Sequence, residues 1–146
     1  MDRFDQWVSI LQNNGCRITA PRRAILKVIA ESHRALQPGE VYELSRVKHP
    51  RIGLVTVYRT LDRLEELGLI QRVHRDDGCH MLMPAPTGHE HYLVCTHCGR
   101  TILFEGDNLG ELFARVESGT GYRVSDHWLQ LFGICPDCRE LDQIHN

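Results

Sequence analysis

Residues 54–68, LVTVYRTLDRLEELG, place apolar side chains at the spacing of an amphipathic helix. Val57, Leu61 and Leu64 fall on one stripe, which we expect to be buried. Gly68 is the residue type that most often follows the end of a helix. The stretch therefore predicts a helix with one face packed against a core and the opposite face exposed.

The exposed face of this predicted helix carries groups that can read DNA. Arg59 lies opposite the apolar stripe, with Tyr58, Thr56 and Arg63 near it. In a major groove an arginine can pair with guanine, and an aromatic edge can meet a thymine methyl. Charged helix faces are also common on helices that are merely solvated, so the pattern alone leaves both readings open.

The neighbouring segments predict the rest of a winged helix-turn-helix domain. Helical patterns precede the stretch at Phe4–Leu11, TAPRRAILKVIAES (19–32) and QPGEVYELSRVKHP (37–50). After it, LIQRVHRDDGCHMLM (69–83) alternates around Asp77-Gly78, which is a hairpin signal. The hairpin would be the wing, with Arg72, His74 and Arg75 in or near it.

Charge and composition restrict the class of protein. The net charge is −2, but residues 1–80 carry +3 and residues 81–146 carry −5, so the first half is the better candidate for contact with phosphates. The apolar runs are too short for a membrane span, and the N-terminal stretch does not resemble a signal peptide. With no export feature, six cysteines favour metal binding over disulfides, and we expect a cytoplasmic protein without membrane contact.

Two C-x-x-C pairs predict a closed metal site. They are CTHC at 95–98 and CPDC at 135–138. Four thiolates match the tetrahedral preference of zinc, and a site filled by protein ligands leaves no position for a reacting water. We therefore expect one structural Zn²⁺ per chain, held by Cys95, Cys98, Cys135 and Cys138. A rubredoxin-type iron site for electron transfer is the alternative.

A second group of metal ligands lies next to these cysteines. In HEH at 89–91, His89 and His91 point to the same side of an extended backbone, so they can share one metal. Cys79 and His80 precede them, Glu105 follows, and MPAPTG (83–88) between them has the composition of a hinge. The pattern predicts an exchangeable metal near that hinge.

The region between the cysteine pairs predicts a small α/β domain. HYLVC (91–95), RTILFE (100–105) and YRVSDHWLQLFGIC (122–135) read as strands, and NLGELFARVES (108–118) reads as a helix. Trp128, Leu129, Leu131 and Phe132 supply more apolar surface than so small a sheet can bury. A homodimer interface would cover it.

Taken in order, GCRITAPRRAIL, TVYRTLDRLEELGLI, HEHYLVCTHCGR and CPDC resemble the ferric uptake regulator family of metal-dependent bacterial repressors. The resemblance spans nearly the whole chain. It implies a winged-helix domain that binds DNA and a C-terminal dimerisation domain. It also implies roles for particular residues: DNA contacts at Arg17, Arg22, Tyr58 and Arg59, structural zinc at the four cysteines, and a regulatory site between domains using His33, His89 and His91.

The chain departs from the family pattern at several ligand positions. Leu103 stands where iron and peroxide sensors tend to have a carboxylate, and Glu105 on the same strand is the expected substitute. Gly88 and Gly110 stand at two positions of a further family site, for which His80, Glu90 and His127 are the candidates that remain. Cys79 favours zinc over iron(II) or manganese, and the hinge resembles that of zinc uptake regulators.

We therefore expect an α+β protein with a winged-helix domain at 1–83, a hinge at 84–91 and a dimerisation and metal-binding domain at 92–146. The expected function is a repressor that binds pseudo-palindromic double-stranded operator DNA as a homodimer when a second metal, most simply Zn²⁺, fills the regulatory site. The alternatives are an iron-, manganese- or peroxide-responsive regulator of the same family, or a zinc-buffering structural protein. An enzyme would need an open metal position and a substrate cleft, which the sequence does not indicate.

Overall fold

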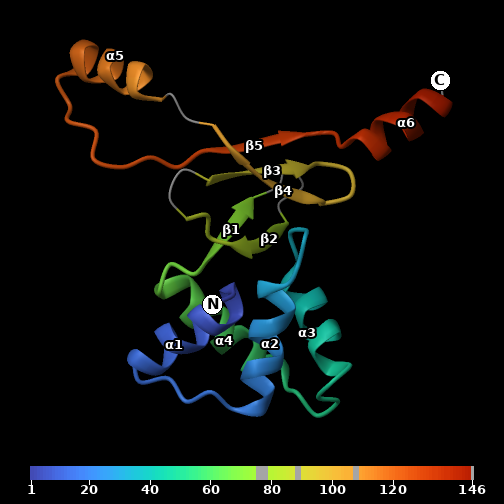
Figure 1. Ribbon diagram of the computed structural model, residues 1–146. Helices are drawn as coiled ribbons and strands as arrows, with labels where there is room; N and C mark the ends of the chain where they lie inside the picture. The colour runs from blue at the N-terminus through green and yellow to red at the C-terminus, as the bar shows by residue number, and fades with distance from the viewer. Residues whose placement is uncertain (75–78, 88–89, 107–108, 146) are drawn as a thin grey trace. The chain divides into compact units, whose positions relative to one another are not determined.

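The computed structural model describes the chain apart from residues 75–78, 88–89, 107–108 and 146 (Figure 1). The chain divides into two compact units, Met1–Ala85 and Pro86–Asn146. The division falls inside the segment 84–91 that the sequence suggests as a hinge.

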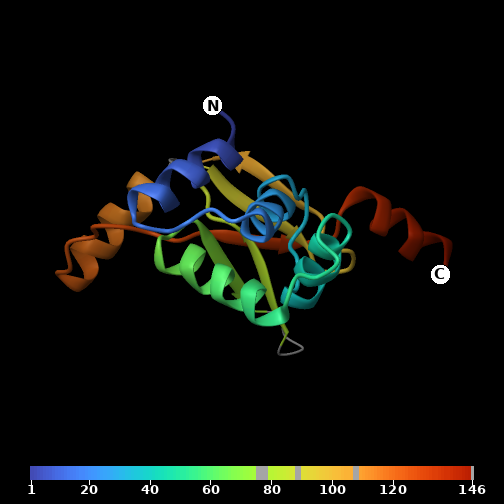
Figure 2. The same ribbon diagram turned by 90° about the horizontal axis from the view of Figure 1, so that it is seen from below.

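The first unit begins with helices α1 (Arg3–Asn13), α2 (Ala20–Ala30), α3 (Pro38–Arg46) and α4 (Leu54–Glu66), which lie side by side in Figures 1 and 2. Their starts follow local chemistry. The Asp2 side chain accepts from the Asp5 backbone N–H at 2.8 Å, and Thr19 accepts from the Arg22 N–H at 3.3 Å. The Glu40 carboxylate accepts from the Gln37 N–H at 2.7 Å, as part of a capping box that starts α3.

The apolar faces of these helices form one core. Val57, Leu61 and Leu64 are each 0% exposed, which confirms the predicted stripe of α4. Buried residues from the other helices pack against it, among them Trp7, Leu11, Ile25, Leu26, Ile29 and Val41. Ile10 of α1 is 36% exposed, whereas Trp7 and Leu11 of the same helix are buried.

A hairpin completes the first unit. Strands β1 (Ile70–His74) and β2 (His80–Pro84) pair antiparallel, from Ile70 opposite Pro84 to His74 opposite His80. The predicted turn at Asp77-Gly78 lies outside the described residues. Leu36 and Leu82 exchange backbone hydrogen bonds of 2.9 and 2.6 Å, which fastens the hairpin to the segment before α3. Helices followed by this hairpin make the expected winged helix-turn-helix.

The second unit contains a small sheet and two helices, one before and one after the last strand of the sheet. Strands β3 (Glu90–Cys95), β4 (Thr101–Glu105) and β5 (Gln130–Gly133) form a sheet of order β4-β3-β5, in which β4 is antiparallel and β5 parallel to β3. Helix α5 (Gly110–Thr120) lies in the connection between β4 and β5, the two strands on opposite edges of this sheet. Helix α6 (Pro136–Ile144) follows β5.

Two features of this unit differ from the expectation. The strand predicted over 122–135 is confined to Gln130–Gly133. Before it, the Val124 N–H donates to the Glu117 side chain at 2.8 Å and the His127 N–H donates to the Asp126 side chain at 2.8 Å. Side chains thus take backbone donors that a longer strand would give to a neighbour. Helix α6 was not predicted; its first turn contains Pro136, which suits that position.

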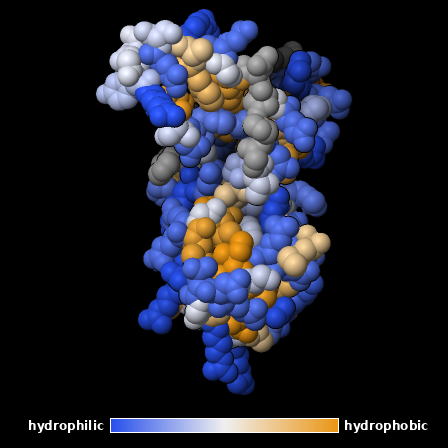
Figure 3. Space-filling view, turned by 60° about the vertical axis from the view of Figure 1, so that its left-hand side comes forward, coloured by the Kyte–Doolittle hydropathy of each residue, from blue (hydrophilic) through white to orange (hydrophobic). Residues whose placement is uncertain are grey.

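The second unit buries little apolar surface by itself. No residue in Gly110–Thr120 is buried, and Trp128, Leu131 and Phe132 are 59%, 44% and 49% exposed. Figure 3 shows apolar side chains in orange on the outer surface of this unit. So much exposed apolar area calls for a covering partner. Across the described ranges of the chain, no helix is long and apolar enough to cross a membrane.

The core of the first unit gives a stability prediction. Leu61→Ala should lower the free energy of unfolding by about 2–5 kcal/mol, because it leaves a cavity at a fully buried position. Val55→Ala, at a site on the same helix that is 63% exposed, is the matched control and should change it by less than about 0.5 kcal/mol. Urea unfolding followed by Trp7 fluorescence in a Trp128→Phe background measures both. Equal stability of the two variants would mean that α4 does not pack as described.

Candidate metal centres and DNA-binding helix

The four cysteines of the two C-x-x-C pairs converge in the second unit. Their Sγ atoms all lie within 4.8 Å of one another, and the Sγ atoms of Cys98 and Cys135 are 3.7 Å apart. Sulfurs bound to one tetrahedral zinc at about 2.3 Å lie about 3.8 Å from each other. The cluster therefore has the spacing and the ligand type of a closed structural metal site.

Local backbone structure places these thiols. Gly99 ends the first pair with φ 75°, and its N–H donates to the Cys95 carbonyl at 2.9 Å, which makes the tight knuckle turn. Cys135 is the N-cap of α6 and Cys138 lies in the first turn of this helix. Arg100 and Asp137 join the two knuckles by an ion pair of 2.8 Å.

The thiols of the cluster perturb one another. Burial raises the pKa of the Cys95 thiol, but backbone N–H groups, first that of Cys135, donate to its sulfur and bring the pKa down to about 6. A hydrogen bond to the Cys135 sulfur, together with burial, raises the pKa of Cys138 to about 12. Four thiols this close cannot all ionise alone, and a bound dication removes the repulsion between them.

His91 is the second candidate metal ligand that the structure places clearly. Its side chain is 3% exposed, and its Nε2 atom has no hydrogen-bond partner within the described residues. The ring centroid of His127 lies 5.4 Å from that of His91, and the ring of Phe113 packs on His127 at 5.1 Å. Two imidazoles on one tetrahedral ion, bound at about 2.1 Å, would have centroids roughly 5 Å apart. The separation of the two rings therefore matches that of two imidazoles on one metal, and the Nε2 atom of His91 is available as a ligand.

This arrangement corrects the predicted grouping of ligands. Opposite residues of paired strands share a face, and His91 lies opposite Phe104 whereas Glu90 lies opposite Glu105. Glu105 is therefore on the other face of the strands from His91. His127, which the sequence suggested only for a further site, is the residue brought to His91.

The remaining predicted ligands are distributed as follows. His33 and Cys79 are exposed in the first unit, where His80 also pairs with His74 in the hairpin. Glu90 accepts a hydrogen bond from the Thr87 hydroxyl at 3.0 Å, so its carboxylate is held near the start of β3. His89 lies outside the described residues.

Helix α4 presents the predicted DNA-reading groups. Arg59 is exposed, Tyr58 is 44% exposed, and Thr56 is partly buried on the same N-terminal turns. Val55, which sequence reasoning did not single out, is 63% exposed one turn before Arg59. Apolar side chains in that position can meet thymine methyls. Its exposure could have been predicted from the sequence, because Val55 does not fall on the helical stripe of Val57, Leu61 and Leu64.

The arginines near this helix have different roles. Arg17 is exposed, whereas the Arg22 guanidinium donates to the Arg17 carbonyl at 2.7 Å and holds the loop between α1 and α2. Arg63, predicted beside Arg59, instead bonds back to the end of α1: its Nε lies 3.1 Å from the Cys16 Sγ and its Nη2 lies 3.1 Å from the Asn14 carbonyl. Arg63 therefore joins α4 to the end of α1.

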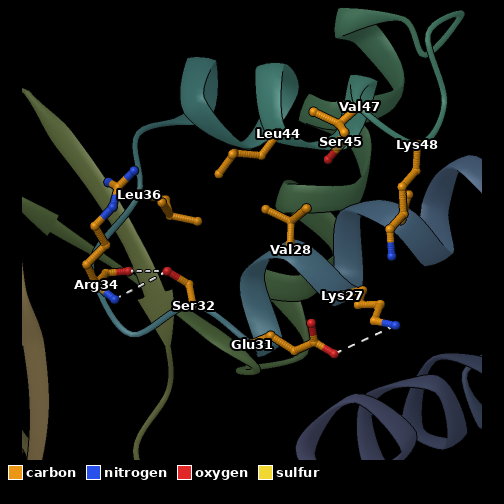
Figure 4. A pocket seen from close by; sticks show the side chains of 11 residues that line it. Lys27, Val28, Glu31, Ser32, Arg34, Leu36, Leu44, Ser45, Val47 and Lys48 are labelled. Atoms are coloured by element: carbon orange, nitrogen blue, oxygen red, sulfur yellow. Dashed lines mark hydrogen bonds and ion pairs between the residues drawn. The ribbon is translucent and has the colours of Figure 1, made fainter.

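A cavity of about 480 Å³ lies between α2 and α3 (Figure 4). Figure 4 shows Val28, Leu36 and Leu44 across it, with the amines of Lys27 and Lys48 at one side. Its lining contains no cysteine or histidine among the residues described, and the carboxylate of Glu31 is paired with Lys27 at 3.9 Å. The residues that line this cavity therefore do not form a metal site.

Known proteins resemble this chain over most of its length. Residues 13–132 match the Ferric uptake regulator family. The ferric uptake regulation protein of Neisseria meningitidis serogroup A is 31% identical over 142 residues, 95% of this chain and 96% of that protein. The peroxide-responsive repressor PerR of Staphylococcus saprophyticus is 29% identical over 138 residues, 94% and 93% of the two chains. The Helicobacter pylori ferric uptake regulator, described as having three functional metal binding sites, is 22% identical and shares the fold with TM-score 0.71 over 94% of this chain and 91% of that one.

The cysteine cluster gives a prediction about metal content. Cys138→Ser should weaken metal binding by at least about 100-fold, because even ligands of the outer shell contribute up to that factor. The variant should lose about one metal ion per chain on dialysis against a chelator, and its second unit should melt at lower temperature. Elemental analysis and thermal unfolding measure these changes, and Cys16→Ser is the matched control for metal content. Retention of both metal and melting temperature in Cys138→Ser would overturn the site.

Proposed function

The chain belongs to the ferric uptake regulator family, whose members are metal-responsive transcription regulators rather than enzymes, and we propose that this member is a zinc-dependent repressor. It binds operator DNA as a homodimer through α4, and its operator is pseudo-palindromic because the dimer presents two equivalent helices. The observation that carries the proposal is the presence of two separate candidate metal centres, one of thiols and one of imidazoles, in a chain whose other unit is a winged helix.

The two centres have different tasks in this proposal. Four cysteines close the coordination sphere of one Zn²⁺, which holds the second unit together. The imidazoles of His91 and His127 bind a second, exchangeable ion. His89 lies two residues before His91 on the chain, at the spacing of side chains that share one face of an extended segment.

Ligand chemistry favours zinc as the signal. Iron(II) and manganese prefer sites that combine imidazole with carboxylate. Leu103 stands at the position where a carboxylate was expected, and Glu105 lies on the other face of the strands from His91. An imidazole-rich site without these carboxylates suits zinc. The additional roles proposed for Cys79 and His33 would strengthen this preference.

Metal bound at His91 acts close to the segment that joins the two units. His91 is the second residue of β3, and the second unit begins only five residues earlier at Pro86. The ion would fix the conformation of the segment that joins the two units. It would thereby favour the arrangement of the dimer that fits the operator. Coupling between metal and DNA of this kind is typically about 1–3 kcal/mol.

The DNA-reading role of α4 is tested with Arg59. Arg59→Ala should weaken operator binding by about 1–3 kcal/mol through loss of a base contact, with a smaller effect on random duplex DNA. Arg17→Ala should weaken binding to both duplexes by a similar factor and reduce the salt dependence, as loss of a phosphate contact does. Gel-shift titrations over a salt series measure both, with Arg115→Ala as the control for charge. Equal losses on both duplexes for Arg59→Ala would exclude base reading.

The regulatory centre is tested with His127, because this residue is exposed and its replacement should leave the fold intact. His127→Ala should keep the structural zinc and the dimer while reducing the zinc-stimulated gain in operator affinity by about tenfold or more. His145→Ala, at an exposed histidine of the same unit, should behave as the original protein. Unchanged zinc dependence in His127→Ala would place the sensing metal elsewhere. Stimulation of the original protein by iron(II) or manganese, but not by zinc, would reject the zinc signal.

A further inference from the structure

We propose that Arg72 is a positioning residue for DNA binding, which neutralises the acidic half of the recognition helix and fixes the wing strand against it. The inference rests on the proposed function, because it concerns the same DNA-binding surface. It assigns to Arg72 a contact within the protein, where the sequence suggested only a place in or near the wing.

The Arg72 guanidinium connects two elements of the first unit. From β1, its Nε donates to the Glu65 carboxylate at 2.7 Å and its Nη2 donates to the Asp62 carboxylate at 3.2 Å. Asp62 and Glu65 are neighbours on one side of α4, three residues apart. The planar guanidinium thus spans nearly one turn of the helix with fixed geometry. The backbone of Arg72 is fixed too, since it lies opposite Leu82 in the hairpin.

Charge explains why this contact matters for DNA. Helix α4 carries Arg59 and Arg63 against three acids, so by itself it is slightly acidic. Glu66 is paired with Arg63 at 3.0 Å, and Arg72 pairs the other two acids. Asp62 lies three residues after Arg59 on α4, so an unpaired carboxylate there would add negative charge close to the proposed DNA-binding surface. With Arg72 in place, Arg59 is the charged group of α4 that makes no ion pair to any described residue.

Stability alone does not account for this pair of contacts. The Asp62 and Glu65 side chains are 62% and 41% exposed, and ion pairs this exposed contribute little to folding. Their electrostatic effect is felt by a charged partner instead. Carboxylates near a polyanion weaken its binding in a salt-dependent way, and neutralising them removes that penalty.

A rescue experiment tests the inference. The probes are an operator selected from random duplexes by the zinc-loaded protein and a random duplex of equal length. Arg72→Ala should weaken binding to both by about tenfold at low salt, and the loss should shrink as salt screens the exposed acids. Adding Asp62→Asn and Glu65→Gln to Arg72→Ala should restore affinity for the random duplex to within about threefold of the original protein.

The conservative variant separates charge from positioning. Arg72→Lys keeps the charge but not the planar fork, so it should bind the random duplex normally and the operator less tightly. The inference is overturned if the triple variant stays as weak as Arg72→Ala, because Arg72 would then contact DNA directly, or if Arg72→Ala binds both duplexes normally. If Arg72→Ala fails to fold, the Arg72→Lys comparison decides: a variant that binds both the operator and the random duplex as tightly as the original protein overturns the positioning role. Failure of the original protein to bind any DNA would instead reject the proposed function.

Discussion

The convergence of four thiols is the constraint on which the second unit depends. Cys95 and Cys135, 40 residues apart in sequence, are brought together by the pairing of β3 with β5, and Cys98 and Cys138 follow each of them. Few side chains of this unit are buried, so hydrophobic packing within one chain contributes little to holding it. A structural zinc can contribute about 10 kcal/mol or more. In the proposed account such an ion is part of the fold, and the signal comes from a second, weaker centre.

Local patterns predicted the parts of the structure that short-range physics determines. The stripe of Val57, Leu61 and Leu64 follows from helical periodicity, and each of these residues is fully buried. The C-x-x-C pairs predicted a cluster because thiolates at that spacing suit one ion, and the four sulfurs do gather. In both cases the relevant interaction lies within one element or has a short spacing that sequence shows directly.

Contacts between distant segments were harder to predict. Alternation placed His89 and His91 on one side of an extended segment, but only the register of β3 with β4 shows that Glu105 lies on the other face from His91. The approach of His127 depends on the irregular stretch before β5, where side chains rather than a neighbouring strand accept backbone N–H groups. Likewise, nothing in the sequence around Arg72 indicates that it reaches from β1 to Asp62 and Glu65 on α4.

The central claim is that one metal holds the fold and a different metal controls DNA binding. Stepwise addition of cobalt(II) to metal-free protein, with absorption spectra and operator affinity recorded at each step, tests it most directly. We predict that the first equivalent produces the charge-transfer absorption of cobalt–thiolate bonds and restores the folded second unit without saturating operator binding. The second equivalent should add only the weaker spectrum of nitrogen ligation, together with the rise in operator affinity. Full operator affinity after the first, thiolate-bound equivalent would contradict the account.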